Sequence, residues 1–99
     1  MRQIAHPLPD SIPRCKAGHH PQLVETHGAP LRAAIGTPVP VTWHIECHQC
    51  GVATVPSESR ARTETRWRDT AGTFRIPLSR LGHAREQALA ALNPAARAA

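Results

Sequence analysis

The chain has 99 residues and a formal net charge of +5, from 12 basic and 7 acidic side chains. One Phe, two Trp, one Met and no Tyr make a thin apolar inventory. This length allows one small domain, whose poor core needs a staple such as a metal or a disulfide. No apolar run is long enough to cross a bilayer, and the first residues lack a secretory signal. We therefore expect a cytoplasmic protein without a membrane partner.

Prolines dominate the first part of the chain, where seven of the ten lie within residues 1–40. Residues 1–13 are expected to form an extended, poorly ordered arm. Residues 22–26 fit a short strand, and 28–40 fit a long loop punctuated by Gly and Pro. Leu31 and Ile35 in this loop are candidate apolar contacts for a partner.

Alternation of apolar and polar residues predicts a hairpin in the middle of the chain. In residues 41–47, Trp43, Ile45 and Cys47 alternate with polar side chains, which is the period of a strand with one apolar face. Residues 52–55 fit a returning strand. The sheet is therefore expected to contain a hairpin or three short strands.

Two helices are expected in the second half. Ser57 is a candidate N-cap for a helix over residues 57–68. Residues 73–76 fit a short extended segment, and Ser79 is a second candidate N-cap. Apolar residues then fall on one side of an amphipathic helix over 81–92. That narrow face could cover the sheet or form a homodimer.

Basic charge is concentrated in residues 57–85, which hold seven arginines against three acidic residues, a net charge of +4. Guanidinium groups pair with phosphates and with carboxylates, so this region fits either nucleic acid or an acidic protein surface. The candidate contact residues are Arg60, Arg62, Arg66, Arg68, Arg75 and Arg80.

The three cysteines point to a metal. The run Cys-His-Gln-Cys-Gly at 47–51 follows the best strand, and such a turn supplies two thiolates to a structural zinc. Cys15 lies upstream and is followed by His19 and His20. Three thiolates and one imidazole complete a tetrahedral set for one structural Zn²⁺. We assign the ligands to Cys15, His19, Cys47 and Cys50, with His20 as the alternative to His19.

Other uses of the cysteines fit less well. An odd number of cysteines suits disulfides badly, and C-x-x-C in a reducing compartment indicates metal binding or redox chemistry. A thioredoxin-like pair would begin a helix, whereas a β-like Val-Ala-Thr-Val follows here. We therefore predict a small α+β zinc ribbon of short antiparallel strands over 14–76, followed by a C-terminal helix over 77–93 and a tail at 94–99.

The order of these pieces resembles the restriction-alleviation zinc-ribbon family of phages and prophages. The matching pieces are Cys15, Pro-Gln-Leu-Val at 21–24, the strand and C-x-x-C-G at 43–51, and Trp67-Arg68. The resemblance covers about residues 14–69, and it departs at Gly18, where a second cysteine of the first knuckle would stand. It implies a non-enzymatic accessory protein that binds and modulates, or inhibits, a host complex of nucleic-acid processing or defence.

Three functions of different classes follow. The first is a zinc-stapled module that docks on such a host protein complex. The second is direct nucleic-acid binding through the arginines of 60–80, with affinity that falls with salt. The third is a zinc-dependent nucleic-acid enzyme with Glu46 or Glu25 as base, but the chain has no H-E-x-x-H signature and no phosphate-binding Gly loop. We predict the first function, without enzymatic activity.

Overall fold

The computed structural model describes residues 2–27, 41–69 and 71–92. In these ranges the chain forms a five-stranded antiparallel sheet and two α-helices, an α+β fold as predicted. Cys and His side chains cluster among the strands, which is compatible with a zinc ribbon. In chain order, the elements are β1 (Arg2–Pro7), β2 (Gln22–His27), β3 (Thr42–Cys47), β4 (Val52–Thr54), α1 (Arg60–Arg68), β5 (Arg75–Pro77), the short 3₁₀ helix η1 (Leu78–Arg80) and α2 (Leu81–Leu92).

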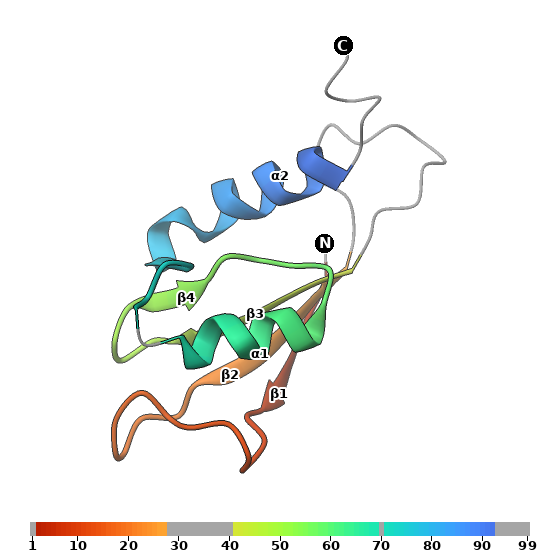
Figure 1. Cartoon of the computed structure of the whole chain (residues 1–99). Helices are drawn as coiled ribbons and strands as arrows, with labels where there is room; N and C mark the ends of the chain where they lie inside the picture. Colours follow the sequence, from red (N-terminus) through yellow and green to blue (C-terminus); the bar gives the residue numbers. More distant parts are fainter. Residues whose placement is uncertain (1, 28–40, 70, 93–99) are drawn as a thin grey trace.

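The strands follow each other across the sheet in the order of the sequence, from β1 to β5 (Figure 1). The prediction of a poorly ordered N-terminal arm is wrong for residues 2–7, because β1 pairs along its length with β2, from Arg2 opposite His27 to Pro7 opposite Gln22. Its terminal proline and its exposed residues suit an edge strand, where one row of backbone groups needs no partner. The sheet is therefore larger than the predicted hairpin or three strands.

The strand β3 is buried on both faces, although alternation predicts one apolar and one polar face. Ile45 and Cys47 lie on the α1 side of the sheet, whereas Thr42 and His44 lie on the other side and are 0% and 1% exposed. The polar side is covered because Arg85 of α2 donates from Nε to Thr42 Oγ1 over 3.2 Å. Figure 1 shows α1 drawn across the strands and α2 beyond β4, and the Arg85 contact places α2 on the Thr42 side.

The helix α1 begins later than the predicted residue 57. Ser59 is its N-cap, and the Ser59 hydroxyl accepts a hydrogen bond from the Arg62 amide. Ser57 instead forms a β-bridge with Trp43 through two backbone hydrogen bonds of 2.7 and 3.0 Å. That bridge keeps Ser57 extended, so the helix starts only after the chain has left the sheet.

The main core lies between α1 and the sheet. It consists of Ile12, Leu23, Ile45, Cys47 and Trp67. Trp67 is 2% exposed and Cys47 is fully buried, so a predicted metal ligand is also a core residue. The core and the candidate metal centre are therefore parts of one packed unit.

The predicted C-terminal helix is present as α2. It follows η1, which contains Ser79, so Ser79 does not act as the predicted cap. Leu89 and Arg85 are buried, and Leu81 is half-buried. Among the described residues, no helix is long and apolar enough to span a bilayer. The predicted loop contacts Leu31 and Ile35 and the tail at 94–99 lie outside the described residues.

Candidate metal centre

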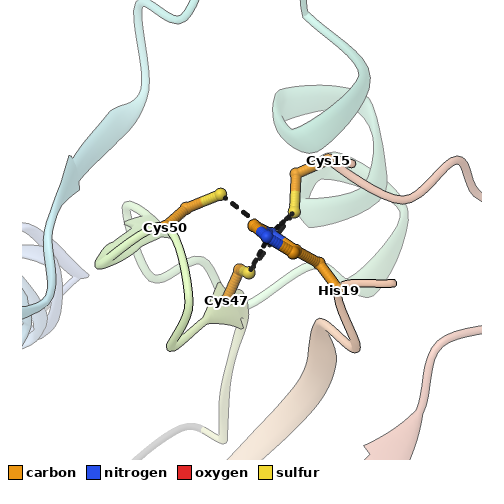
Figure 2. Close-up of side chains that lie close together, drawn as sticks. All are labelled: Cys15, His19, Cys47 and Cys50. Carbon is orange, nitrogen blue, oxygen red and sulfur yellow. Dashed lines mark hydrogen bonds between the residues drawn. The ribbon is translucent and has the colours of Figure 1, made fainter. Parts of the chain in front are cut away.

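Four side chains from two loops converge at one end of the sheet. Cys15 and His19 come from the loop between β1 and β2, whereas Cys47 and Cys50 come from the turn between β3 and β4. Figure 2 shows the His19 ring pointing at the three sulfur atoms. The four ligand atoms all lie within 4.8 Å of one another, so this set matches the predicted ligands.

The nitrogen–sulfur distances at this centre are close to those of a zinc site. The His19 Nδ1 lies 3.3 Å from the Cys15 and Cys50 sulfurs and 3.5 Å from the Cys47 sulfur. Zn–N and Zn–S bonds at tetrahedral angles place nitrogen and sulfur about 3.5 Å apart and two sulfurs about 3.8 Å apart. The Cys15 and Cys47 sulfurs are 3.3 Å apart, too far for a disulfide. The residues therefore fit one structural Zn²⁺ held by a Cys₃His set.

Glycines shape both ligand loops. Gly51 has a φ of +70°, and its amide donates to the Cys47 carbonyl over 2.9 Å, which closes the Cys47–Cys50 turn. Gly18 has a φ of +81°, and the next residue, His19, reaches the metal position. Only glycine adopts such angles readily. Gly18 stands where a second cysteine of the first knuckle would be. Its turn brings the His19 imidazole to the fourth ligand position.

The helix α1 anchors the first ligand loop. Trp67 donates from Nε1 to the Pro13 carbonyl over 2.8 Å, and Arg68 donates from Nη2 to the Ser11 carbonyl over 2.9 Å. Both acceptor carbonyls belong to residues that come just before Cys15 in the sequence. The end of α1 therefore fixes the first loop against the second one.

The thiols have different proton affinities without a metal. Burial raises the pKa of Cys15 to about 11, together with hydrogen bonds to and repulsion from Cys47 and Cys50. Burial would also raise the pKa of Cys47, but hydrogen bonds from Cys50, Cys15 and Gln49 lower it overall. Three adjacent thiolates repel each other, so a divalent cation is needed to hold them deprotonated together.

The alternative ligand His20 does not join this cluster. It is exposed and lines a surface cavity of about 190 Å³ beside Arg14 and Gln22. His48 lies within the Cys47–Cys50 turn but pairs with the Glu46 carboxylate over 2.7 Å. His19 is therefore the histidine that the structure brings to the three sulfurs.

His44 and Glu46 spell H-x-E ahead of the C-x-x-C, which is part of a zinc-deaminase signature and was not among the predictions. The structure separates these residues from the candidate metal centre. Both lie on the side of the sheet opposite Cys47, where His44 Nε2 lies 3.0 Å from the Glu46 Oε1. Burial lowers the pKa of His44 despite this contact with the carboxylate.

A second histidine cluster was also not predicted. The Glu25 carboxylate accepts hydrogen bonds from His6 of β1 and His27 of β2, one on each oxygen. These two bonds lower the pKa of Glu25. The signal in the sequence was the spacing of Glu25 and His27, since residues two apart on a strand share a face.

Some predicted contact arginines bind backbone carbonyls of this chain. Arg66 donates to the Val55 carbonyl over 3.1 Å and lies over the Phe74 ring. Arg75 donates to the Trp67 carbonyl and lies over the Trp67 ring. The side chains of Arg66, Arg68 and Arg75 therefore form contacts that hold α1 against neighbouring segments of the chain.

The remaining candidates are more exposed. Arg60 lies 3.5 Å from the Glu64 carboxylate and 5.6 Å above the Trp43 ring. The side chains of Arg62 and Arg80 are exposed and make no hydrogen bond or ion pair with other described residues. The predicted arginines therefore do not act as one surface.

No protein-family model, curated protein or solved structure matches this chain.

Proposed function

We propose that this chain is a non-catalytic, zinc-stapled module that docks on a protein complex acting on nucleic acid. The observation that carries the proposal is the set of four protein ligands around one position. Structural zinc sites are closed by four protein ligands, whereas catalytic sites keep a position for water or substrate. The metal would then serve the fold, and the function would lie on the surface.

The use of the arginines favours a protein partner. Arg66 and Arg68 donate to carbonyls of their own chain, which removes them from a continuous phosphate-binding surface. Arg62 and Arg80 remain exposed at separate places. Isolated guanidinium groups suit individual carboxylates of a protein partner. A second copy of the chain is a less favoured partner, because α2 already buries Leu89.

A phage or prophage origin, inhibition of a host defence complex and a cytoplasmic location belong to this proposal through the resemblance stated above. The three free thiols support a reducing compartment. Direct nucleic-acid binding is the second candidate, for which a specific surface is argued below.

An affinity pull-down from bacterial lysate tests the docking function. Zinc-loaded, tagged protein is compared with the charge-reversal variant Arg62→Glu/Arg80→Glu, with nuclease present throughout. A stoichiometric protein that survives nuclease and is lost with the variant is the expected result. His83→Gln, a change at another exposed position, is the matched control. Capture of no stoichiometric partner from any relevant host would refute the proposal.

A further inference from the structure

We propose that the α1 side of the sheet holds a stacking site for single-stranded nucleic acid, built on Trp43 and flanked by His6, Arg60 and Arg2. This site does not rest on the docking function proposed above. It also differs from the predicted arginine surface of residues 60–80, because its centre is an aromatic ring on β3.

The sheet register places the site beside the core rather than in it. Leu23 and Ile45 lie opposite each other and are fully buried under α1. The next row on the same side contains Ile4, Glu25 and Trp43, and these three side chains are only half-buried. The Trp43 row therefore stays partly exposed at the edge of the core, where only Arg60, the first residue of α1, lies over the indole.

The Trp43 ring already has an imidazole ring and a guanidinium group beside it, and nucleobases stack on groups of both kinds. The His6 ring is stacked on it, with centroids 6.1 Å apart and planes at 29°. The Arg60 guanidinium carbon lies 5.6 Å from the centre of the indole. Aromatic rings with an adjacent arginine form sequence-tolerant stacking platforms, because every base has a π-face.

The charges around the ring suit a phosphate backbone. Arg2 precedes Ile4 by two residues on β1 and so lies on the same side of the sheet. Its side chain is exposed and makes no ion pair with the described residues. The acidic residue of the Trp43 row, Glu25, has both oxygens engaged by His6 and His27. Because both oxygens of this carboxylate are already hydrogen-bonded, Glu25 does not pair with Arg2 or Arg60.

A single strand is favoured over a duplex for a geometric reason. The half-buried ring lies among the side chains of three strands, so a base must leave its own stack to lie against it. Unpaired bases do this readily, whereas a duplex must first be unstacked. Arg60 is exposed and weakly paired with Glu64 at 3.5 Å. Its guanidinium group can therefore move away from the Trp43 ring and contact a phosphate instead.

The test uses the purified zinc-loaded chain and a fluorescently labelled 12-nucleotide oligo-dT, with a 12-base-pair duplex for comparison, at low salt. We expect binding to the single strand that exceeds binding to the duplex. Trp43→Leu should weaken it by about 5- to 150-fold, the range for losing one base stack. Arg60→Gln should weaken it and reduce the salt slope by about 1. Arg14→Gln, the same change at an exposed residue outside the site, should leave it unchanged.

Tryptophan emission provides a readout that does not depend on a destabilising variant. Stacking on Trp43 should quench the emission of the wild type when oligo-dT binds. Trp43→Phe keeps a ring, so binding should persist while this quenching disappears, because the remaining Trp67 is 2% exposed. Absence of binding, equal binding of the duplex, or equal losses in Arg60→Gln and Arg14→Gln would each overturn the site.

Discussion

His19 and His20 are neighbours in sequence but have different environments. The left-handed backbone at Gly18, with a φ of +81°, precedes a side chain that points at three sulfurs. The following residue is then directed to the surface cavity. His19 was predicted as the fourth ligand with His20 as the alternative, since three or four intervening residues from Cys15 both suit a zinc loop.

Substitution of each histidine distinguishes the two. We expect His19→Gln to weaken zinc binding by more than the about 10- to 100-fold that is typical of changes outside the ligand set. His20→Gln should retain one zinc per chain with unchanged affinity. Native mass spectrometry gives the stoichiometry, and the cobalt-substituted spectrum reports the ligand set. A loss of metal from His20→Gln with retention in His19→Gln would reverse the assignment.

His44 makes folding stability depend on pH. Burial lowers its pKa in the folded chain, so the unfolded chain, in which histidine has a pKa of about 6.5, binds more protons. The free energy of unfolding therefore reaches its full value above about pH 6.5 and falls as the pH drops, by at most about 1.4 kcal/mol per pH unit for this group. The charged groups facing His44 are Glu46 and Arg85.

His44→Gln should flatten this dependence. Urea unfolding of the zinc-loaded wild type and variant is compared between pH 5 and 8, since the contribution of the metal ligands is common to both and cancels in the difference. The wild type should lose more stability than the variant below about pH 6.5. His83→Gln, at an exposed position, should follow the wild type. Parallel curves for the wild type and His44→Gln would contradict the prediction.

Among the elements, α1 connects the core to the first ligand loop. The Trp67 side chain packs in the core while its Nε1 donates to the Pro13 carbonyl. Trp67→Phe keeps an aromatic ring but leaves that carbonyl without its donor, which costs about 1–3 kcal/mol. We expect a matching loss in the free energy of unfolding by urea, with weaker zinc binding. His83→Gln, at an exposed position away from α1, is the control. Equal effects of both variants would exclude this role of α1.

Elements with strong local signals were predictable from the sequence. Alternation in residues 42–47 and the C-x-x-C-G turn gave β3 and the second ligand loop, and apolar periodicity gave α2. The edge strand β1 was not recognisable, because its sequence contains a terminal proline and its strand character depends on pairing with β2. Local sequence patterns indicate the conformation that a segment itself prefers. They do not indicate which distant strand it pairs with.

The same limit explains the buried polar side of β3. Thr42 and His44 alternate with apolar residues and so were predicted to lie opposite the apolar face of the strand. They are buried because Arg85, an unusual residue on a packed helix face, hydrogen-bonds to Thr42. A polar helix residue that satisfies a polar strand residue leaves no periodic signal. The ligand set was more accessible to sequence analysis, since zinc restricts both the residue types and their spacing.

For the whole molecule, the metal and the core depend on each other. Cys47 belongs both to the ligand set and to a core of five buried residues. Zinc binding to small structural sites contributes about 10–16 kcal/mol, whereas small domains are stable by only about 5–15 kcal/mol in total. We therefore expect that a chain with this core does not keep its fold without the metal.

Removal of zinc should unfold the chain cooperatively. A strong chelator is expected to abolish the β-sheet signal in far-ultraviolet circular dichroism and the thermal transition, and Zn²⁺ should restore both. Mg²⁺ is the control, because it prefers oxygen ligands and does not replace zinc at thiolates. The Arg62→Glu/Arg80→Glu variant should respond like the wild type, since those side chains contact neither the core nor the ligands. A chelated chain that retained its sheet and its melting temperature would show that the core suffices, and the zinc would then have to be explained by something other than folding.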